Sequence, residues 1–311
     1  MNDKKKEPLF HIVKRDALPW YQSVGIRAIA IVLALIVCAV VTMILTGTNP
    51  IQVFQSIIAG AFGSARKTWI TFQNIAILLL ISLALTPAFK MKFWNIGGEG
   101  QVLIGGLASA ACMICLAEKL PAALVVVCMI VTSIAAGAFW AFIPAFFKAK
   151  WNTNETLSTL MMNYIATQLV AFFTIVWEVP KGSGKIGIIN QNSNVGWLPQ
   201  AFGSKYLLSI LVAVLITVFM YIYLKYSKHG YEISVVGESE NTAKYVGIKV
   251  EKVIMRTMAL SGAVCGLVGL LLVGGINHTI TKASCNCHDD CQIQRRFTNL
   301  YSSCDIYIRI T

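Results

Sequence analysis

The residues best suited to chemistry lie in one short segment, residues 95–101, which reads Asn-Ile-Gly-Gly-Glu-Gly-Gln. Asn95, Glu99 and Gln101 bring two amides and a carboxylate into a strongly apolar stretch of sequence. Polar groups at membrane depth are costly, and they commonly line a route for a solute. The segment therefore predicts a substrate pathway. A second interpretation is that its glycines serve close helix packing and that Glu99 lies in a re-entrant turn.

Three further amides fall within other apolar segments and are assigned to the same pathway: Gln73, Asn74 and Asn163. Amides exchange hydrogen bonds with hydroxyl groups and base edges and release them again, as transport requires. No two histidines in the sequence are spaced as a pair on a helix face, and no Ser or Cys has an evident basic partner. The sequence therefore predicts no catalytic residue and no metal site within the apolar spans, and no enzyme activity.

These polar residues belong to a chain far more apolar than a soluble protein. Of 311 residues, 56% are hydrophobic and 13% charged, and the mean hydropathy is +0.67, whereas soluble domains have about 25% charged residues. The net charge of +12 does not indicate nucleic-acid binding, because the basic residues flank apolar runs instead of forming one basic face interleaved with aromatics. We expect an all-α fold, a polytopic transmembrane helical bundle in a lipid bilayer.

Seven apolar runs are long enough to cross a bilayer as helices. The third begins with a glycine-rich stretch, which weakens a regular helix and favours a broken or re-entrant element. Lys and Arg are in excess in the N-terminal segment and in alternate loops, so the positive-inside rule places the N-terminus in the cytoplasm. The expected spans are residues 26–45, 69–89, 96–116, 122–147, 157–177, 206–226 and 253–276.

The spans divide the chain into a cytoplasmic N-terminal segment, residues 1–25, and a transmembrane domain, residues 26–282. Within that domain, residues 227–252 form the longest cytoplasmic loop. Residues 47–68 and 178–205 are expected as the two longer loops on the outer side.

Three motifs follow one another along the chain. The first is the segment at residues 95–101. The second, residues 154–165, reads Asn-Glu-Thr-Leu-Ser-Thr-Leu-Met-Met-Asn-Tyr-Ile, and the third, residues 237–248, reads Gly-Glu-Ser-Glu-Asn-Thr-Ala-Lys-Tyr-Val-Gly-Ile. Together they resemble the permease subunits of bacterial ABC importers, in the branched-chain amino acid and simple-sugar superfamily, and within it the nucleoside-type permeases. The resemblance covers about residues 20–282.

The resemblance implies a permease subunit in a bacterial plasma membrane that moves a nucleoside or a simple sugar. It implies as partners a cytoplasmic ATP-binding subunit, a second permease subunit and an extracellular substrate-binding lipoprotein. No phosphate-binding loop occurs in the sequence, so no cofactor is expected in this chain and ATP would be bound by the partner. The alternative is a stand-alone secondary transporter or channel for a small polar solute, which seven spans alone would equally allow.

In such permeases the long cytoplasmic loop docks onto the ATPase. A short helix around residues 241–246, closed by Gly247, is expected there, with Glu238 and Lys244 orienting it. The alternative is a solvated connector, for which the loop is unusually apolar. The predicted coupling residues are Gly237, Glu238, Ala243, Lys244, Gly247 and Ile248.

Residues 283–311 do not continue the series of apolar spans, although the resemblance implies further C-terminal spans. One interpretation is a metal site, since Cys285, Cys287, His288 and Cys291 are all ligand types. Their compact spacing fits no common zinc module. We therefore favour a frame-shifted or truncated C-terminus, which would leave the channel wall incomplete.

Overall fold

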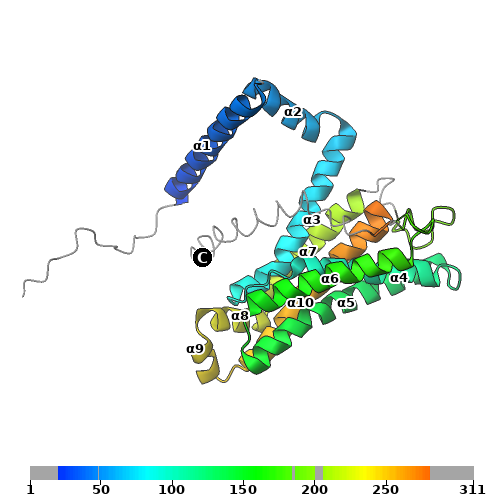
Figure 1. Cartoon of the computed structure of the whole chain (residues 1–311). Helices are drawn as coiled ribbons and strands as arrows, with labels where there is room; N and C mark the ends of the chain where they lie inside the picture. The colour runs from blue at the N-terminus through cyan, green and yellow to red at the C-terminus, as the bar shows by residue number, and fades with distance from the viewer. Residues whose placement is uncertain (1–19, 48, 184–185, 200–205, 281–311) are drawn as a thin grey trace, which may run out of the picture. The chain divides into compact units, whose positions relative to one another are not determined.

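The computed structural model describes residues 20–47, 49–183, 186–199 and 206–280. Within these ranges every regular element is a helix, and seven helices are long and apolar enough to cross a membrane. The predicted all-α polytopic bundle is confirmed (Figure 1). The candidate spans are α1 (Trp20–Thr46), α3 (Ala65–Lys90), α4 (Gly98–Leu116), α5 (Ala122–Trp151), α6 (Glu155–Val176), α7 (Leu207–Tyr226), and α10 (Val250–Leu270) continued by the π-helix η1 (Leu271–Asn277).

The chain separates into two units, residues 1–68 and residues 69–311. The first unit contains α1, which begins inside the segment predicted as residues 1–25, and α2 (Pro50–Phe62). Residues 1–19 lie outside the described part of the chain.

The connection predicted at residues 47–68 is largely helical, because α2 occupies most of it and α3 begins within it. The reason is local. Asn49 caps α2 by accepting a hydrogen bond from the Ile51 amide at 3.0 Å, and Pro50 supplies the first-turn residue that needs no donor. The sequence before Pro50 therefore ends one helix and also starts the next.

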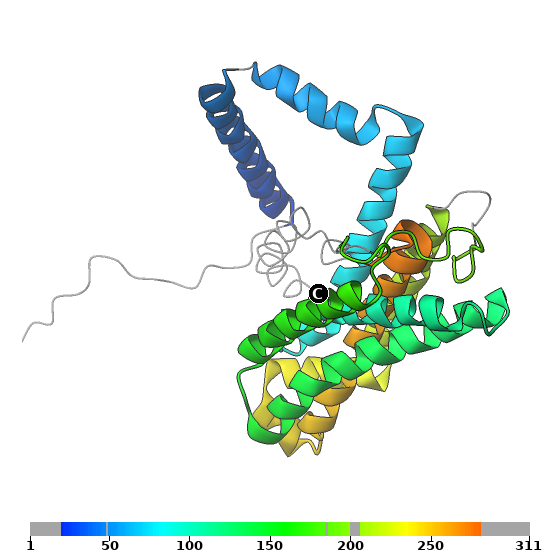
Figure 2. The same ribbon diagram turned by 45° about the vertical axis from the view of Figure 1, so that its right-hand side comes forward.

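In the second unit, α4, α5 and α10 pack directly on one another and α6 packs on α4 (Figures 1 and 2). Glycines allow backbones to meet in this core. A Cβ atom at Gly266 of α10 would overlap the carbonyl oxygen of Ser133 in α5, and one at Gly105 of α4 would overlap Gly266 itself. Close backbone approach through small residues is the usual way in which membrane helices associate.

The expectation of a broken third span is wrong, since α4 runs without interruption from Gly98 to Leu116. Its glycines are accommodated because Gly105 and Gly106 face Gly266 and Gly269, where close packing offsets their low helix propensity. The irregular backbone lies elsewhere, just before α4 and at the end of the seventh span, where α10 passes into η1. The boundaries of the seven predicted spans are otherwise confirmed to within a few residues.

Residues 186–199, part of the predicted outer loop, cover the end of the bundle near η1. The Ile189 amide donates to the His278 carbonyl at 2.8 Å, and the Leu198 amide donates to the Gly274 carbonyl at 3.0 Å. The Trp197 and His278 rings stack with centroids 3.9 Å apart. This loop is therefore joined to the last span by both backbone and ring contacts.

The cytoplasmic loop predicted at residues 227–252 forms α8 (Lys228–Glu238) and α9 (Glu240–Tyr245), at the opposite end of the second unit from the outer loop (Figure 1). The prediction of an aberrant tail at residues 283–311, with its four candidate metal ligands, concerns residues outside the described part of the chain.

Candidate functional site

An irregular segment at residues 93–97 leads into α4, and Asn95 within it is only 1% exposed. Its Oδ1 accepts hydrogen bonds from the Gly97 amide at 3.0 Å and from Gln101 Nε2 at 3.3 Å. Its Nδ2 donates to Ser261 Oγ of α10 at 3.4 Å. Asn95 therefore joins the beginning of α4 to the seventh span.

Asn163 of α6 holds the same segment from another side. Its Nδ2 donates to the Ile96 carbonyl at 2.9 Å, and its Oδ1 accepts from the Gly100 amide at 2.8 Å. Gly100 lies in the first turn of α4, where amides have no partner within the helix. One turn earlier on α6, Thr159 Oγ1 accepts from the Ile96 amide at 3.3 Å. The α6 side chains thus bond backbone groups of this irregular segment and of the first turn of α4, where an apolar interior offers no water.

The structure brings together Asn95, Gln101 and Asn163 of the predicted pathway, which we call the polar cluster. Glu99 lies half-buried in the first turn of α4 beside it. The two predicted amides of α3 differ in burial: Gln73 is buried, whereas the neighbouring Asn74 is exposed.

Spare hydrogen-bonding capacity remains at the polar cluster and on α3. Among the described residues, Gln101 Oε1, Gln73 Nε2 and Thr257 Oγ1 are buried atoms without a hydrogen-bond partner. Thr257 lies one turn before Ser261 on α10. Most polar atoms of the polar cluster already make hydrogen bonds within the chain. Direct contact of the polar cluster with a solute stays a prediction.

Three hydroxyl residues at or near this cluster were missed from the sequence. Thr159 belongs to the second motif, and Thr257 and Ser261 are spaced one turn apart on an apolar helix. That spacing was the available signal, since hydroxyl groups four residues apart form a polar stripe on one helix face.

The predicted coupling loop, residues 227–252, contains the helix that the sequence predicts. Ser239 caps α9 by accepting from the Thr242 amide at 3.3 Å, and Gly247 closes it with a φ of +86°. The Ile248 amide then donates to the Ala243 carbonyl at 2.9 Å, which completes the end of the helix.

The six predicted coupling residues divide into two groups. Gly237 and Ala243 are buried and Ile248 is half-buried, and a Cβ atom at Gly237 would overlap the carbonyl oxygen of Lys90. These residues therefore hold α8 and α9 against the ends of the spans. The exposed residues of the set are Glu238, Lys244 and Gly247.

The loop also exposes large apolar side chains that were not named among the coupling residues. Tyr245 is 95% exposed, and Val246 and Tyr231 are also exposed. The apolar composition of the loop was the signal for them. We call Tyr231, Tyr245 and Val246 the exposed apolar patch of the loop.

An ion pair joins α8 to α10. Arg256 Nη2 donates to Glu232 Oε2 at 2.8 Å, and His229 Nδ1 lies 3.5 Å from the same oxygen. The hydrogen bond from the Arg256 guanidinium holds the pKa of Glu232 below its usual value of 4.5. Because Arg256 and Ser261 share α10, one helix connects the coupling loop to the polar cluster.

Comparison with known proteins agrees with this arrangement. The family described as branched-chain amino acid transport system / permease component matches residues 68–284. The guanosine ABC transporter permease protein NupP of Bacillus subtilis is 33% identical over 246 residues, which are 78% of this chain and 70% of that protein. The nucleoside ABC transporter permease protein NupB of Lactococcus lactis is 28% identical over 258 residues, which are 80% of this chain and 70% of that protein.

A third relative, the glucose ABC transporter permease protein TsgB13 of Haloferax volcanii, is 26% identical over 272 residues, 84% of this chain and 70% of that protein. No solved structure matches the chain. The resemblance inferred from the three motifs is confirmed by these matches. This chain is a multi-pass membrane protein that belongs to the family of branched-chain amino acid transport system permease components, a family of transport permeases and not of enzymes.

Proposed function

We propose that this chain is the permease subunit of an ABC importer that carries nucleosides or simple sugars into a bacterial cell. The substrate class comes from the relatives, two of which are named for guanosine or nucleoside transport and one for glucose transport. The observation that carries the proposal is the coupling loop. Its helices are fixed to the bundle, yet it exposes Tyr245 and its neighbours to whatever docks there.

The docked partner would be an ATP-binding subunit. An aromatic side chain that is almost fully exposed on a short, well-capped helix suits insertion into a groove of a partner protein. With the N-terminus in the cytoplasm, the loop follows an even number of spans and faces the same compartment. A second permease and an extracellular substrate-binding lipoprotein would complete the importer.

The connection through α10 suggests how ATP binding would reach the membrane interior. A displacement of α8 would be transmitted by Glu232 to Arg256, then along α10 to Ser261 and to Asn95. Two sites coupled in this way need a continuous physical element that has two arrangements. The rigid α10 supplies the connection, and the polar cluster is the part whose bonds would rearrange.

The experiment is uptake of labelled guanosine and labelled ribose by cells that express this chain with its partner subunits. We expect uptake that requires the ATP-binding subunit and that Tyr245→Asp reduces to background, because a charge on the exposed apolar patch opposes docking. Lys225→Gln, an exposed change at the end of α7, serves as the matched control and should leave uptake unchanged. Uptake that proceeds without the ATP-binding subunit would instead establish a stand-alone transporter.

A further inference from the structure

The side of α6 that points away from the bundle, which we call the outer face of α6, carries polar side chains. They lie at a depth in the membrane where lipid would leave them unpaired. We propose that this face, centred on Tyr164 and Gln168, is the wall that this chain contributes to the substrate route, and that it contacts the base or the hydroxyl groups of the solute. The proposal rests on the proposed function. It names the surface on which the solute travels.

Tyr164 is 61% exposed, and Gln168 is exposed one turn further along α6. With Ile165 and Leu169 they line a groove of about 350 Å³. Gln168 lies about 20 Å from the start of α6 and about 12 Å from its end. The groove therefore lies near the middle of a span and not at a membrane surface.

Neither polar side chain is satisfied within the described part of the chain. The side chains of Tyr164 and Gln168 make no hydrogen bond to any described residue. A hydroxyl or amide placed in hydrocarbon without a partner is strongly disfavoured. The surface of the groove itself is almost wholly apolar, so the Tyr164 hydroxyl and the Gln168 amide alone distinguish this face from one suited to lipid, and they fit an occupant that offers hydrogen-bonding groups.

The interior of the bundle is a poorer route. Asn163, adjacent to Tyr164, points inward and is bonded to the backbone at Ile96 and Gly100. A solute passing there would have to replace those bonds and separate α6 from α4. The outer face needs no such rearrangement, because the Tyr164 and Gln168 side chains make no bonds to the described residues.

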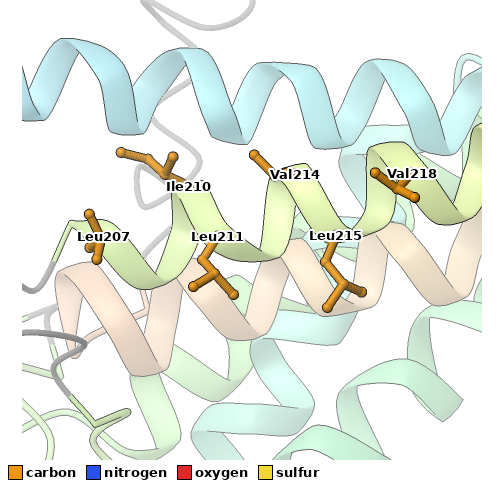
Figure 3. Close-up of a pocket in the computed structure, with 6 residues that line it drawn as sticks. All are labelled: Leu207, Ile210, Leu211, Val214, Leu215 and Val218. Carbon is orange, nitrogen blue, oxygen red and sulfur yellow. The ribbon is translucent and has the colours of Figure 1, made fainter.

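A second groove differs from the first in the residue types that line it. On α7, a larger open groove of about 590 Å³ is lined by aliphatic side chains alone, as Figure 3 shows. Lipid tails satisfy such a surface completely. The lining residues are Leu207, Ile210, Leu211, Val214, Leu215 and Val218.

The chemistry of the α6 face suits a nucleoside. A phenol ring offers a flat surface for a base and a hydroxyl group that both donates and accepts hydrogen bonds. The Gln168 amide has donors and an acceptor that match base edges and sugar hydroxyls alike. Exposed side chains that no other hydrogen bond holds in place bind a solute weakly enough for release, as a transport route requires.

The first test is uptake of labelled guanosine by the assembled importer with Gln168→Leu or Tyr164→Phe. We expect each to lower uptake about tenfold at low guanosine concentration, the effect of one lost hydrogen bond to the solute. Val214→Leu, an apolar change on the α7 face, should leave uptake unchanged. Normal uptake by both α6 variants would overturn the proposal and leave the proposed function intact, whereas absence of ATP-dependent uptake by the unmodified importer would overturn the proposed function first.

The second test measures contact with water. Gln168→Cys and Val214→Cys are each treated, in the assembled importer, with a membrane-impermeant thiol reagent, and the unmodified chain gives the background from its own cysteines. We expect labelling above background at position 168 alone, and guanosine should reduce it. A position 168 that is labelled only when the second permease is absent would show a dry subunit contact and would overturn the route.

Discussion

The two sides of α6 carry the same chemical group in opposite states. On the inner side the Asn163 amide is buried and donates and accepts bonds of 2.9 and 2.8 Å with backbone groups. On the outer side the Gln168 amide is exposed and makes no hydrogen bond to the described residues. One amide completes the hydrogen bonds of a neighbouring segment, and the other has no partner among the described residues.

This difference in bonding assigns the inner amide of α6 to the stability of the fold and the outer amide to transport. An amide whose bonds are all made within the bundle contributes to the fold, and its loss leaves buried groups unsatisfied. An amide whose bonds are all to be made with a solute contributes to transport, and its loss leaves the fold as it was. Substitutions on the two sides should therefore have opposite patterns of effect.

The largest effect is expected behind the inner side of α6, where α4, α5 and α10 meet. Gly266→Ala should destabilise the chain by about 3 kcal/mol or more, because the new methyl group would collide with backbone atoms of Ser133 that cannot rotate away. Thermal unfolding in detergent, followed by size-exclusion chromatography, measures this. Gly25→Ala is the matched control, since nothing lies within 4 Å of the atom it adds.

A smaller loss is expected from the polar cluster itself. Asn163→Leu keeps the approximate volume but leaves the Ile96 carbonyl and the Gly100 amide without their side-chain partner. An unsatisfied buried group costs about 1–3 kcal/mol, so the lost bond to the Gly100 amide should by itself lower stability by about 1–3 kcal/mol in the same unfolding assay. An Asn163→Leu chain as stable as the original would show that water replaces the amide and that the cluster is open to solvent.

Much of the architecture followed from the sequence because span length and hydropathy are local properties. The predicted spans agree with the helices to within a few residues. The predictions that differ from the structure depend on contacts between distant segments, or on residues that have two local roles at once. The α4 glycines suggest a broken helix in the sequence, whereas in the structure Gly266 and Gly269 pack against them. Asn49 and Pro50 follow the end of one helix and also begin the next.

The site was predictable by residue type but not by arrangement. Asn95, Gln101 and Asn163 were singled out as polar groups in apolar runs, and the structure brings them together, but only the fold shows that they bond the backbone. Tyr164 and Gln168 were passed over. Their spacing of four residues places them on one face, yet sequence alone does not tell which face of α6 the bundle covers.

A modest effect is expected at the connection between α8 and α10. Glu232→Gln removes the charge-assisted bond to Arg256 and should lower stability by about 1 kcal/mol at neutral pH, since the pair is partly exposed. The Glu232 pKa is lowered in the folded chain, so its contribution is complete above its usual value of 4.5 and is lost as the pH falls through the lowered pKa.

The stability difference between the Glu232→Gln chain and the original should therefore shrink in acid, as measured by unfolding at a series of pH values. Glu238→Gln, a change at an exposed carboxylate of the same helix, is the control and should be neutral. A difference that stays constant through the acid range would show that the carboxylate acts by packing and not by charge.

The smallest effect on stability is expected on the outer side of α6. Gln168→Leu should change the free energy of unfolding by no more than about 0.5 kcal/mol, because no bond to a described residue is lost and leucine favours a helix at least as well as glutamine. The measurement is again unfolding in detergent, made beside Asn163→Leu. If Gln168→Leu were as damaging to the isolated chain as Asn163→Leu, the outer amide would have a structural partner within the chain and the contrast between the two sides of α6 would fail.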